Sequence, residues 1–208
     1  MELVAEAMDG GWTAAAGPFS RIAEQLLSDA HDGAAVLLCT SCTGAWELAA
    51  MTRGIGPGDV VAVPSFTFPS TASAFARTGA RLRFIDIDPN TLGMDADHLA
   101  EQLDHRVKAV VPVHYAGRQA SIEAVCAAAD RVGAQVVEDN AHGMFGAHGG
   151  KALGTFGSMS TLSFHETKNF ICGEGGALVI NDRSHLENAE ILLHKGTDRR
   201  RFDRGQVD

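Results

Sequence analysis

Short apolar runs alternate with longer, alanine-rich amphipathic stretches from about residue 35 onward. This alternation is typical of βαβ units, in which a helix connects two parallel strands of one sheet. The apolar runs predict strands at 35–39, 60–63, 81–85, 109–113, 134–138, 160–164 and 176–181. The stretches between them predict helices at 44–53, 69–78, 95–103, 120–132 and 184–195. We therefore expect an α/β fold with a mostly parallel, seven-stranded sheet between helices.

Composition and charge limit the classes of partner. The chain has 208 residues, 45% of them hydrophobic, which favours a single domain with a buried core. Its formal net charge of -9 disfavours a surface that neutralises nucleic-acid phosphates. We interpret the basic cluster at 195–204 as a solvated helix end rather than a nucleic-acid-binding surface. Contact with an anionic substrate or a partner subunit is the alternative.

The sequence also bears on location. No apolar run approaches the roughly 18 residues of a membrane span. The first residues are acidic, whereas a signal peptide begins with basic residues. We expect a cytoplasmic protein that binds neither nucleic acid nor a membrane.

The cysteines are too few to indicate a disulfide scaffold in a chain of this size. They are Cys39, Cys42, Cys126 and Cys172, and we expect free thiols. Cys39 and Cys42 form a C-x-x-C pair, but no second pair completes a zinc site. Ordinary buried cysteines are the favoured interpretation, and no metal is expected.

In an open parallel sheet, ligands bind at the carboxyl ends of the strands, so the residues after each strand are examined first. Ser41, Thr43 and Gly44 follow the first predicted strand and precede a helix. Hydroxyls and free N–H groups at a helix N-terminus can bind an anion. Taken alone, this segment favours a simple N-cap over a binding site.

Aromatic residues and a histidine follow two further strands. Phe66 and Phe68 come after the strand at 60–63, where a ring can stack on a planar cofactor or pack into the core. His114 and Tyr115 come after the strand at 109–113. For His114, binding a ligand and capping the strand end remain equal alternatives.

Two carboxylates follow the strand at 134–138. Glu138, Asp139 and His142 lie in the segment EDNAHG, where an unpaired buried carboxylate is costly. A carboxylate there needs a cationic partner, and a protonated pyridine nitrogen, a metal ion or an internal Arg or Lys would each serve. Metal is weakly supported, because His142 and His148 lack the helical spacing of a zinc protease.

Lys168 is singled out by elimination among four lysines. Lys108 precedes a strand, Lys151 follows two glycines and Lys195 ends a helix, so all three resemble surface charges. Lys168 alone lies just past a strand end in the expected ligand crevice. The crevice then combines an anion site, aromatic rings, an acid and one amine. Pyridoxal phosphate has a use for each of these groups.

The chain resembles the DegT/StrS family of sugar aminotransferases, which have the type I aspartate aminotransferase fold. The matching strings are SCTGAWELAA, GPGDVVAVPSFTFPSTASAF, VPVHYAG, VVEDNAHG, ALGTFGSMSTLSFHETKN and GEGGALVIND. Within the family, SFHETKN followed by GEGG and KGT…FDRGQVD is most similar to the TDP-4-keto-6-deoxyglucose 4-aminotransferases of surface polysaccharide pathways.

The resemblance implies roles for seven residues around pyridoxal 5'-phosphate. Lys168 resembles the Schiff-base lysine, Asp139 the acid paired with the pyridine nitrogen, and His142 the residue beside the phenolic oxygen. Thr43, Gly44 and Ser163 match phosphate contacts, and Phe68 matches the ring-stacking position. The implied reaction moves an amino group from glutamate to a TDP-4-keto-6-deoxyhexose, with Lys168 as general base, in a homodimer.

Family members continue past FDRGQVD into a small C-terminal domain. We therefore expect residues 1–208 to be an incomplete pyridoxal phosphate-binding large domain with the small domain missing. One alternative is a non-catalytic or partner-dependent cofactor-binding fragment. Another is a pyridoxal phosphate-dependent sugar dehydratase, although such enzymes usually carry histidine at the Lys168 position. A generic Rossmann domain is a weaker alternative, because no strand precedes G-x-G-x-x-G.

Overall fold

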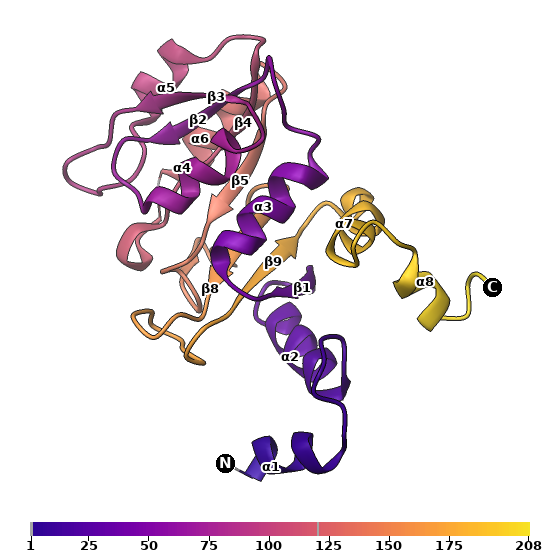
Figure 1. The fold of residues 1–208 in the computed structure, drawn as a ribbon. Helices are drawn as coiled ribbons and strands as arrows, with labels where there is room; N and C mark the ends of the chain where they lie inside the picture. The colour runs from indigo at the N-terminus through magenta and orange to yellow at the C-terminus, as the bar shows by residue number, and fades with distance from the viewer. Residues whose placement is uncertain (1, 120) are drawn as a thin grey trace.

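The computed structural model describes residues 2–119 and 121–208, and its centre is a seven-stranded sheet with helices on both faces (Figure 1). The strands are β1 Ala35–Cys39, β2 Val60–Pro64, β3 Arg81–Ile85, β4 Val107–Val110, β5 Gln135–Asp139, β8 Met159–Ser163 and β9 Gly176–Ile180. Their order across the sheet is β1-β9-β8-β5-β4-β2-β3. Only β9 runs antiparallel to its neighbours in this sheet. The expected mostly parallel α/β sheet is therefore confirmed.

The helices of the described residues lie mainly between strands. They are α1 Glu2–Asp9, α2 Pro18–Asp29, α3 Cys42–Thr52, α4 Pro69–Ala76, α5 Ala96–Gln102, α6 Ile122–Asp130, α7 Leu186–Leu193 and α8 Arg199–Asp203. Short elements are β6 Ala147–His148, β7 Lys151–Ala152 and the 3-10 turns η1 Tyr115–Gly117 and η2 Arg183–His185.

Alternate residues of β2 belong to two of the three hydrophobic clusters that cover the sheet. Val61 and Val63 of β2 pack beneath α3, α4 and α7, whereas Val60 and Ala62 pack beneath α5 and α6. Successive side chains of a strand point to opposite faces, and both faces here are covered by helices. This explains why the strands appear in the sequence as continuous apolar runs.

Several predicted boundaries were wrong. The strand predicted at 109–113 is Val107–Val110, because Pro112 has no N–H with which to continue the ladder. The helix predicted at 120–132 is Ile122–Asp130, and residue 120 lies outside the described residues. The helix predicted at 184–195 divides into η2 and α7. Helices α1, α2 and α8 were not predicted, since they lie outside the strand–helix alternation.

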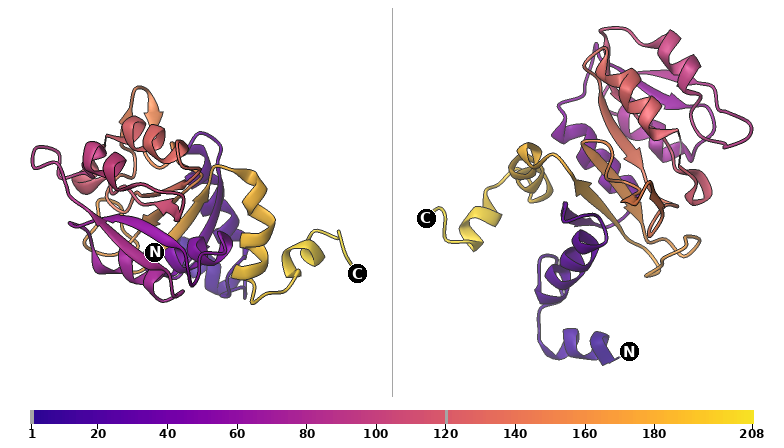
Figure 2. Two further views of the ribbon diagram at one scale, coloured as in Figure 1. Left: turned by 90° about the horizontal axis from the view of Figure 1, so that it is seen from above. Right: turned by 180° about the vertical axis from the view of Figure 1, so that it is seen from behind.

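The basic cluster is largely exposed, as predicted for a solvated helix end, and its arginines also pair with acids. Its four arginines pair with acids of the same chain, as Arg199–Asp203, Arg200–Glu24, Arg201–Glu187 and Arg204–Glu190. Two of these acids lie on α7 and one lies on α2, so the pairs link α8 to these two helices at the edge of the fold (Figure 2). The charge of the cluster is thus balanced within the chain. No helix in the described part of the chain is both long and apolar enough to span a membrane.

All four cysteines are free thiols, as expected, but they are not equally buried. Burial raises the pKa of Cys39 to about 11, of Cys42 to about 12 and of Cys126 to about 11. Cys172 is exposed, contrary to the prediction of buried cysteines.

We expect one fast-reacting thiol when the native chain meets a disulfide reagent near pH 8, because only the thiolate attacks. Cys172→Ser is expected to remove that phase and leave three slow thiols, measured by release of the coloured leaving group. A second fast thiol in the native chain, or a fast phase that survives in Cys172→Ser, would contradict the burial pattern.

Candidate active site

A cavity of about 620 Å³ lies at the carboxyl ends of the central strands. Its walls come from the start of α3, the loop between β2 and α4, the end of β5 and the loop between β8 and β9. Six of the seven residues singled out from the sequence line it. They are Thr43, Phe68, Asp139, His142, Ser163 and Lys168. Gly44, the seventh, is not among the lining residues.

The start of α3 explains the position of Gly44. The helix begins at Cys42, two residues earlier than predicted, and Ser41 is its N-cap. The Oγ of Ser41 accepts the backbone N–H of Gly44 at 3.0 Å, so the N-cap interpretation is confirmed. Thr43 therefore lies in the first turn and borders the cavity, where N–H groups of a helix N-terminus favour an anion.

A glycine on β9 allows this helix start to sit against the sheet. A Cβ added at Gly176 would lie 2.3 Å from the backbone nitrogen of Cys42 and 2.4 Å from the carbonyl carbon of Ser41. No side chain fits in that space. The close approach of β9 thus places the N-terminus of α3 at the cavity wall.

Asp139 is the last residue of β5 and is only 4% exposed. Its Oδ2 accepts the hydroxyl of Thr71 at 2.7 Å and its Oδ1 accepts the N–H of Ala141 at 3.1 Å. No ion pair to Asp139 occurs among the residues that the structure describes. A buried carboxylate with neutral donors alone favours a cationic group beside it. Thr71 was not singled out from the sequence. It lines the cavity together with its neighbour Ser70 and the nearby Thr67.

Lys168 reaches the cavity from the loop between β8 and β9. It is partly buried, whereas Lys108, Lys151 and Lys195 are exposed, so the elimination among the lysines placed it correctly. Its Nζ lies 3.0 Å from Nε2 of His142. Burial and the charge of Lys168 lower the pKa of His142 against the opposing effect of Asp139.

Aromatic rings form the rim of the cavity. Phe66 and Tyr115 pack with their centroids 4.6 Å apart, and Tyr115 packs edge-on against His142 at 5.3 Å. Phe68 lines the cavity but is 68% exposed, so one face of its ring is open. Phe66, Tyr115 and Trp46 therefore line the cavity together with Phe68.

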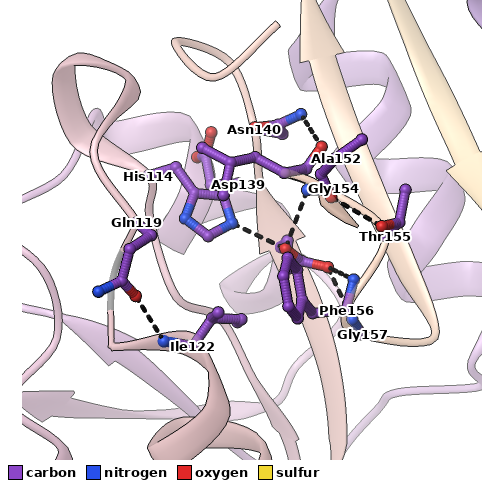
Figure 3. A network of polar contacts seen from close by, with 12 residues as sticks. His114, Gln119, Ile122, Asp139, Asn140, Ala152, Gly154, Thr155, Phe156 and Gly157 are labelled. Carbon is purple, nitrogen blue, oxygen red and sulfur yellow. Dashed lines mark hydrogen bonds and ion pairs between the residues drawn. The ribbon is translucent and has the colours of Figure 1, made fainter. Parts of the chain in front are cut away.

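Glu138 and His114 belong to a separate, buried network, and neither residue lines the cavity. Figure 3 shows His114 in this network with Gly154, Phe156 and Gly157. Both side chains have no exposure, and His114 Nε2 lies 2.7 Å from Glu138 Oε2. Glu138 also accepts the N–H groups of Gly154, Phe156 and Gly157 at 3.0, 2.7 and 2.6 Å. Neither of the two alternatives for His114, binding a ligand or capping the strand end, describes this side chain, which pairs with a buried acid away from the cavity. Glu138 and Asp139, adjacent on β5, point to opposite faces.

Replacing Glu138 by alanine is expected to lower the free energy of unfolding by about 3–5 kcal/mol, because four buried donors lose their acceptor. Urea denaturation measures the change. Glu123→Ala is the matched control, since Glu123 is 62% exposed and pairs only with His148 at the surface. Its effect should stay within about 0.5 kcal/mol. Equal losses in the two variants would contradict this account of the network.

The cavity fits pyridoxal phosphate by the chemistry of its donors. The helix N-terminus at Thr43 suits the phosphate, and the buried carboxylate of Asp139 suits a protonated pyridine nitrogen. The amine of Lys168 suits the aldehyde, and the rings at the rim suit the flat cofactor. No cluster of three or more His, Cys, Asp or Glu in the described residues is placed to hold a metal ion.

Comparison with known proteins supplies the decisive observation. The sequence model of the DegT/DnrJ/EryC1/StrS aminotransferase family matches residues 1–208.

The chain belongs to this aminotransferase family.

Individual relatives agree with that assignment. The spore coat polysaccharide biosynthesis protein SpsC of Bacillus subtilis is 35% identical over 201 residues, covering 97% of this chain and 51% of SpsC. The structure of DesI in the presence of its TDP-sugar product has a TM-score of 0.89 and 31% identity. It covers 95% of this chain and 50% of DesI. The aminotransferase TlmJ from Streptoalloteichus hindustanus has a TM-score of 0.86 and 36% identity, covering 91% of this chain and 52% of TlmJ.

Family membership confirms the fold class inferred from the sequence. The sheet and its helices match those of pyridoxal phosphate-dependent aminotransferases. The chain spans about half the length of SpsC and of the structures to which it is similar.

Proposed function

We propose that the chain binds pyridoxal 5'-phosphate and takes part in moving an amino group from glutamate to a TDP-4-keto-6-deoxyhexose. One observation carries this proposal. A partly buried lysine amine and a buried carboxylate that forms no ion pair within the described residues line the same cavity of about 620 Å³. The bound cofactor would supply an electron sink that allows a proton to leave the carbon bearing the amino group.

Lys168 and Asp139 perform the chemistry in this proposal. Lys168 binds the cofactor aldehyde between turnovers and, once released, carries a proton as general base. Asp139 holds a positive charge on the pyridine nitrogen. Without that charge, its carboxylate would be buried in the cavity wall with no cationic partner, which is costly. The donors from Thr71 and Ala141 orient this carboxylate.

The remaining predicted residues bind and orient. Thr43 and Ser163 donate to the phosphate together with the free N–H groups of α3. The N–H of Gly44 already bonds Ser41, so we propose that Gly44 only shapes this turn. Phe68 stacks on one face of the cofactor ring, and His142 lies beside its phenolic oxygen.

Two relatives favour the proposed substrate class. DesI was determined in the presence of its TDP-sugar product, and SpsC is named for spore coat polysaccharide biosynthesis. A homodimer in the cytoplasm is part of the proposal, with residues 1–208 as the cofactor-binding part of the large domain.

Mass analysis of the sugar tests the proposal. The chain is mixed with the cofactor, glutamate and TDP-4-keto-6-deoxyglucose, with and without a full-length family member. Replacement of the carbonyl oxygen by an amine supports an aminotransferase, whereas loss of a hydroxyl indicates the alternative dehydratase. If the chain binds the cofactor but forms product only when the full-length family member is added, it is a partner-dependent fragment. If the chain neither binds the cofactor nor forms a product, the proposal is overturned.

A further inference from the structure

The loop between β8 and β9, which carries Lys168, is closed at its base by backbone hydrogen bonds. The N–H of Cys172 donates to the carbonyl of Phe164 at 2.9 Å. We name residues 164–173 the lysine loop. Within the described chain, residues 167–171 at its tip form no backbone–backbone hydrogen bond with a different segment. Side chains therefore decide where the tip lies.

Three contacts join the lysine loop to the loop after β5, in the same order along both segments. They are Lys168–His142 at 3.0 Å, Asn169–Met144 at 2.9 Å and Phe170–Phe145 at 5.7 Å between ring centroids. In the second contact, the side-chain amide of Asn169 donates to the backbone carbonyl of Met144. The two loops thus meet over neighbouring residues, starting from the pair that lines the cavity.

The loop after β5 is a rigid support for these contacts. A Cβ added at Gly143 would lie 1.9 Å from Oδ1 of the buried Asn140, and the N–H of Gly146 donates to the carbonyl of Gly143 at 2.8 Å. Phe145 has a φ of 66, in the left-handed region that residues with a Cβ rarely adopt. Such backbone persists where the surrounding structure determines it. The carbonyl of Met144 is therefore held in a fixed place.

The ring of Phe170 adds a second attachment beside Asn169. It packs edge-on against Phe145 of the support and against Phe164 at 5.9 Å. Phe164 follows β8 directly and is buried. Edge-on aromatic pairs stabilise beyond the area that they bury. The two residues after Lys168 in the sequence are thus both fastened.

The position of a lysine amine depends on the backbone that carries it. Ordering the long side chain of Lys168 already costs conformational entropy. A tip that also moved would add to this cost whenever the amine met an aldehyde. That bond forms between the amine nitrogen and the aldehyde carbon with release of one water. Fastening the tip beforehand removes part of the entropic cost.

We propose that Asn169, together with Phe170, is a positioning residue that fastens the lysine loop to the loop after β5 and so holds the amine of Lys168 at the cavity. The inference deepens the proposed function and rests on it, since Lys168 is there the amine that bonds the cofactor.

Amide hydrogen exchange of the chain without cofactor tests this attachment, read by mass spectrometry of lysine-loop peptides. Asn169→Leu keeps the approximate size of the side chain but removes its donor. The amides of Thr167 and Lys168, which donate to His165, should exchange about fivefold faster, the factor that one net hydrogen bond represents. Asn169→Gln should restore slow exchange, because its amide can still donate to Met144. Unchanged exchange in Asn169→Leu would overturn the proposal.

Two forms of the cofactor separate positioning of the amine from a general loosening of the cavity. Pyridoxal phosphate can bond Lys168, whereas pyridoxamine phosphate carries an amine in place of the aldehyde and cannot. Titrations followed by absorbance should show that Asn169→Leu weakens binding of pyridoxal phosphate about two- to fivefold and leaves binding of pyridoxamine phosphate unchanged. Equal weakening of both forms, or of neither, would overturn the positioning role.

Asn188→Leu is the matched control in both measurements. Asn188 is exposed like Asn169, and its amide likewise donates to a backbone carbonyl of another segment, that of Thr52 at 3.1 Å. It lies on α7 and does not line the cavity, so loop exchange and both affinities should stay unchanged. If the unchanged chain bound neither form of the cofactor, the proposed function would fail, and hydrogen exchange would still decide whether Asn169 fastens the loop.

Discussion

Replacing Lys168 by alanine is expected to abolish covalent capture of pyridoxal phosphate by the chain. Lys168 is the one lysine among the residues that line the cavity, and the three others are exposed. Without its amine no side chain there can bond the aldehyde, and the visible absorbance band of lysine-bound cofactor should not form. Transamination should fall by at least about 10²–10⁴-fold, the usual contribution of a positioned acid–base group.

Two variants control this experiment. Lys168→Arg keeps the positive charge but cannot bond the aldehyde, so it should also lack the band. Lys151→Ala removes an exposed lysine that lies over the ring of Phe156, 4.6 Å from its centroid, and should keep the band. A normal absorbance band in Lys168→Ala would show that the cofactor bonds to another amine, which would contradict the proposed role of Lys168.

Replacing Asp139 by asparagine is expected to weaken cofactor binding by about 10²- to 4 × 10³-fold, which corresponds to the roughly 3–5 kcal/mol lost when one partner of a buried ion pair is removed. The amide oxygen can still accept the N–H of Ala141, and the NH2 group can donate to the hydroxyl oxygen of Thr71. The amide carries no charge, however, to hold a proton on the pyridine nitrogen. Titration of the variant with cofactor, followed by absorbance, measures the change in Kd.

The same variant should not destabilise the chain without cofactor. Asp139 is buried without an ion-pair partner in the described residues, so removing its charge lifts a desolvation cost. Urea denaturation should show an unchanged or higher midpoint. Asp130→Asn, at an exposed position on α6, should alter neither measurement. Tight cofactor binding by Asp139→Asn would remove the proposed role of this carboxylate.

Much of the architecture was predictable because it is encoded locally. Most strands of the large sheet contain an apolar run, since helices cover both faces, and the number of strands follows from counting those runs. The edge strand β3, RLRFI, is more exposed. Lys168 could be singled out because only four lysines are present and only one follows a strand end. The N-cap by Ser41 was also predictable, because capping involves residues three positions apart.

Other features of the site depend on contacts between distant segments. The sequence placed Glu138 and Asp139 together after a strand, but only the fold separates them onto opposite faces. Glu138 meets His114 and the loop before β8, whereas Asp139 meets Thr71 at the cavity. No local pattern marks Thr71 as the partner of an acid 68 residues away.

The sequence by itself determined an α/β chain with one lysine suited to an aldehyde cofactor, because side-chain periodicity and the order of strands and loops are local properties. Only the tertiary structure decided what surrounds that lysine. His142 reaches Lys168 from the loop after β5, and the amide of Ala116 reaches His142 from the loop after β4. The physical reason is that hydrogen-bond partners and burial arise where separate strands end side by side, and no single stretch of sequence specifies that meeting.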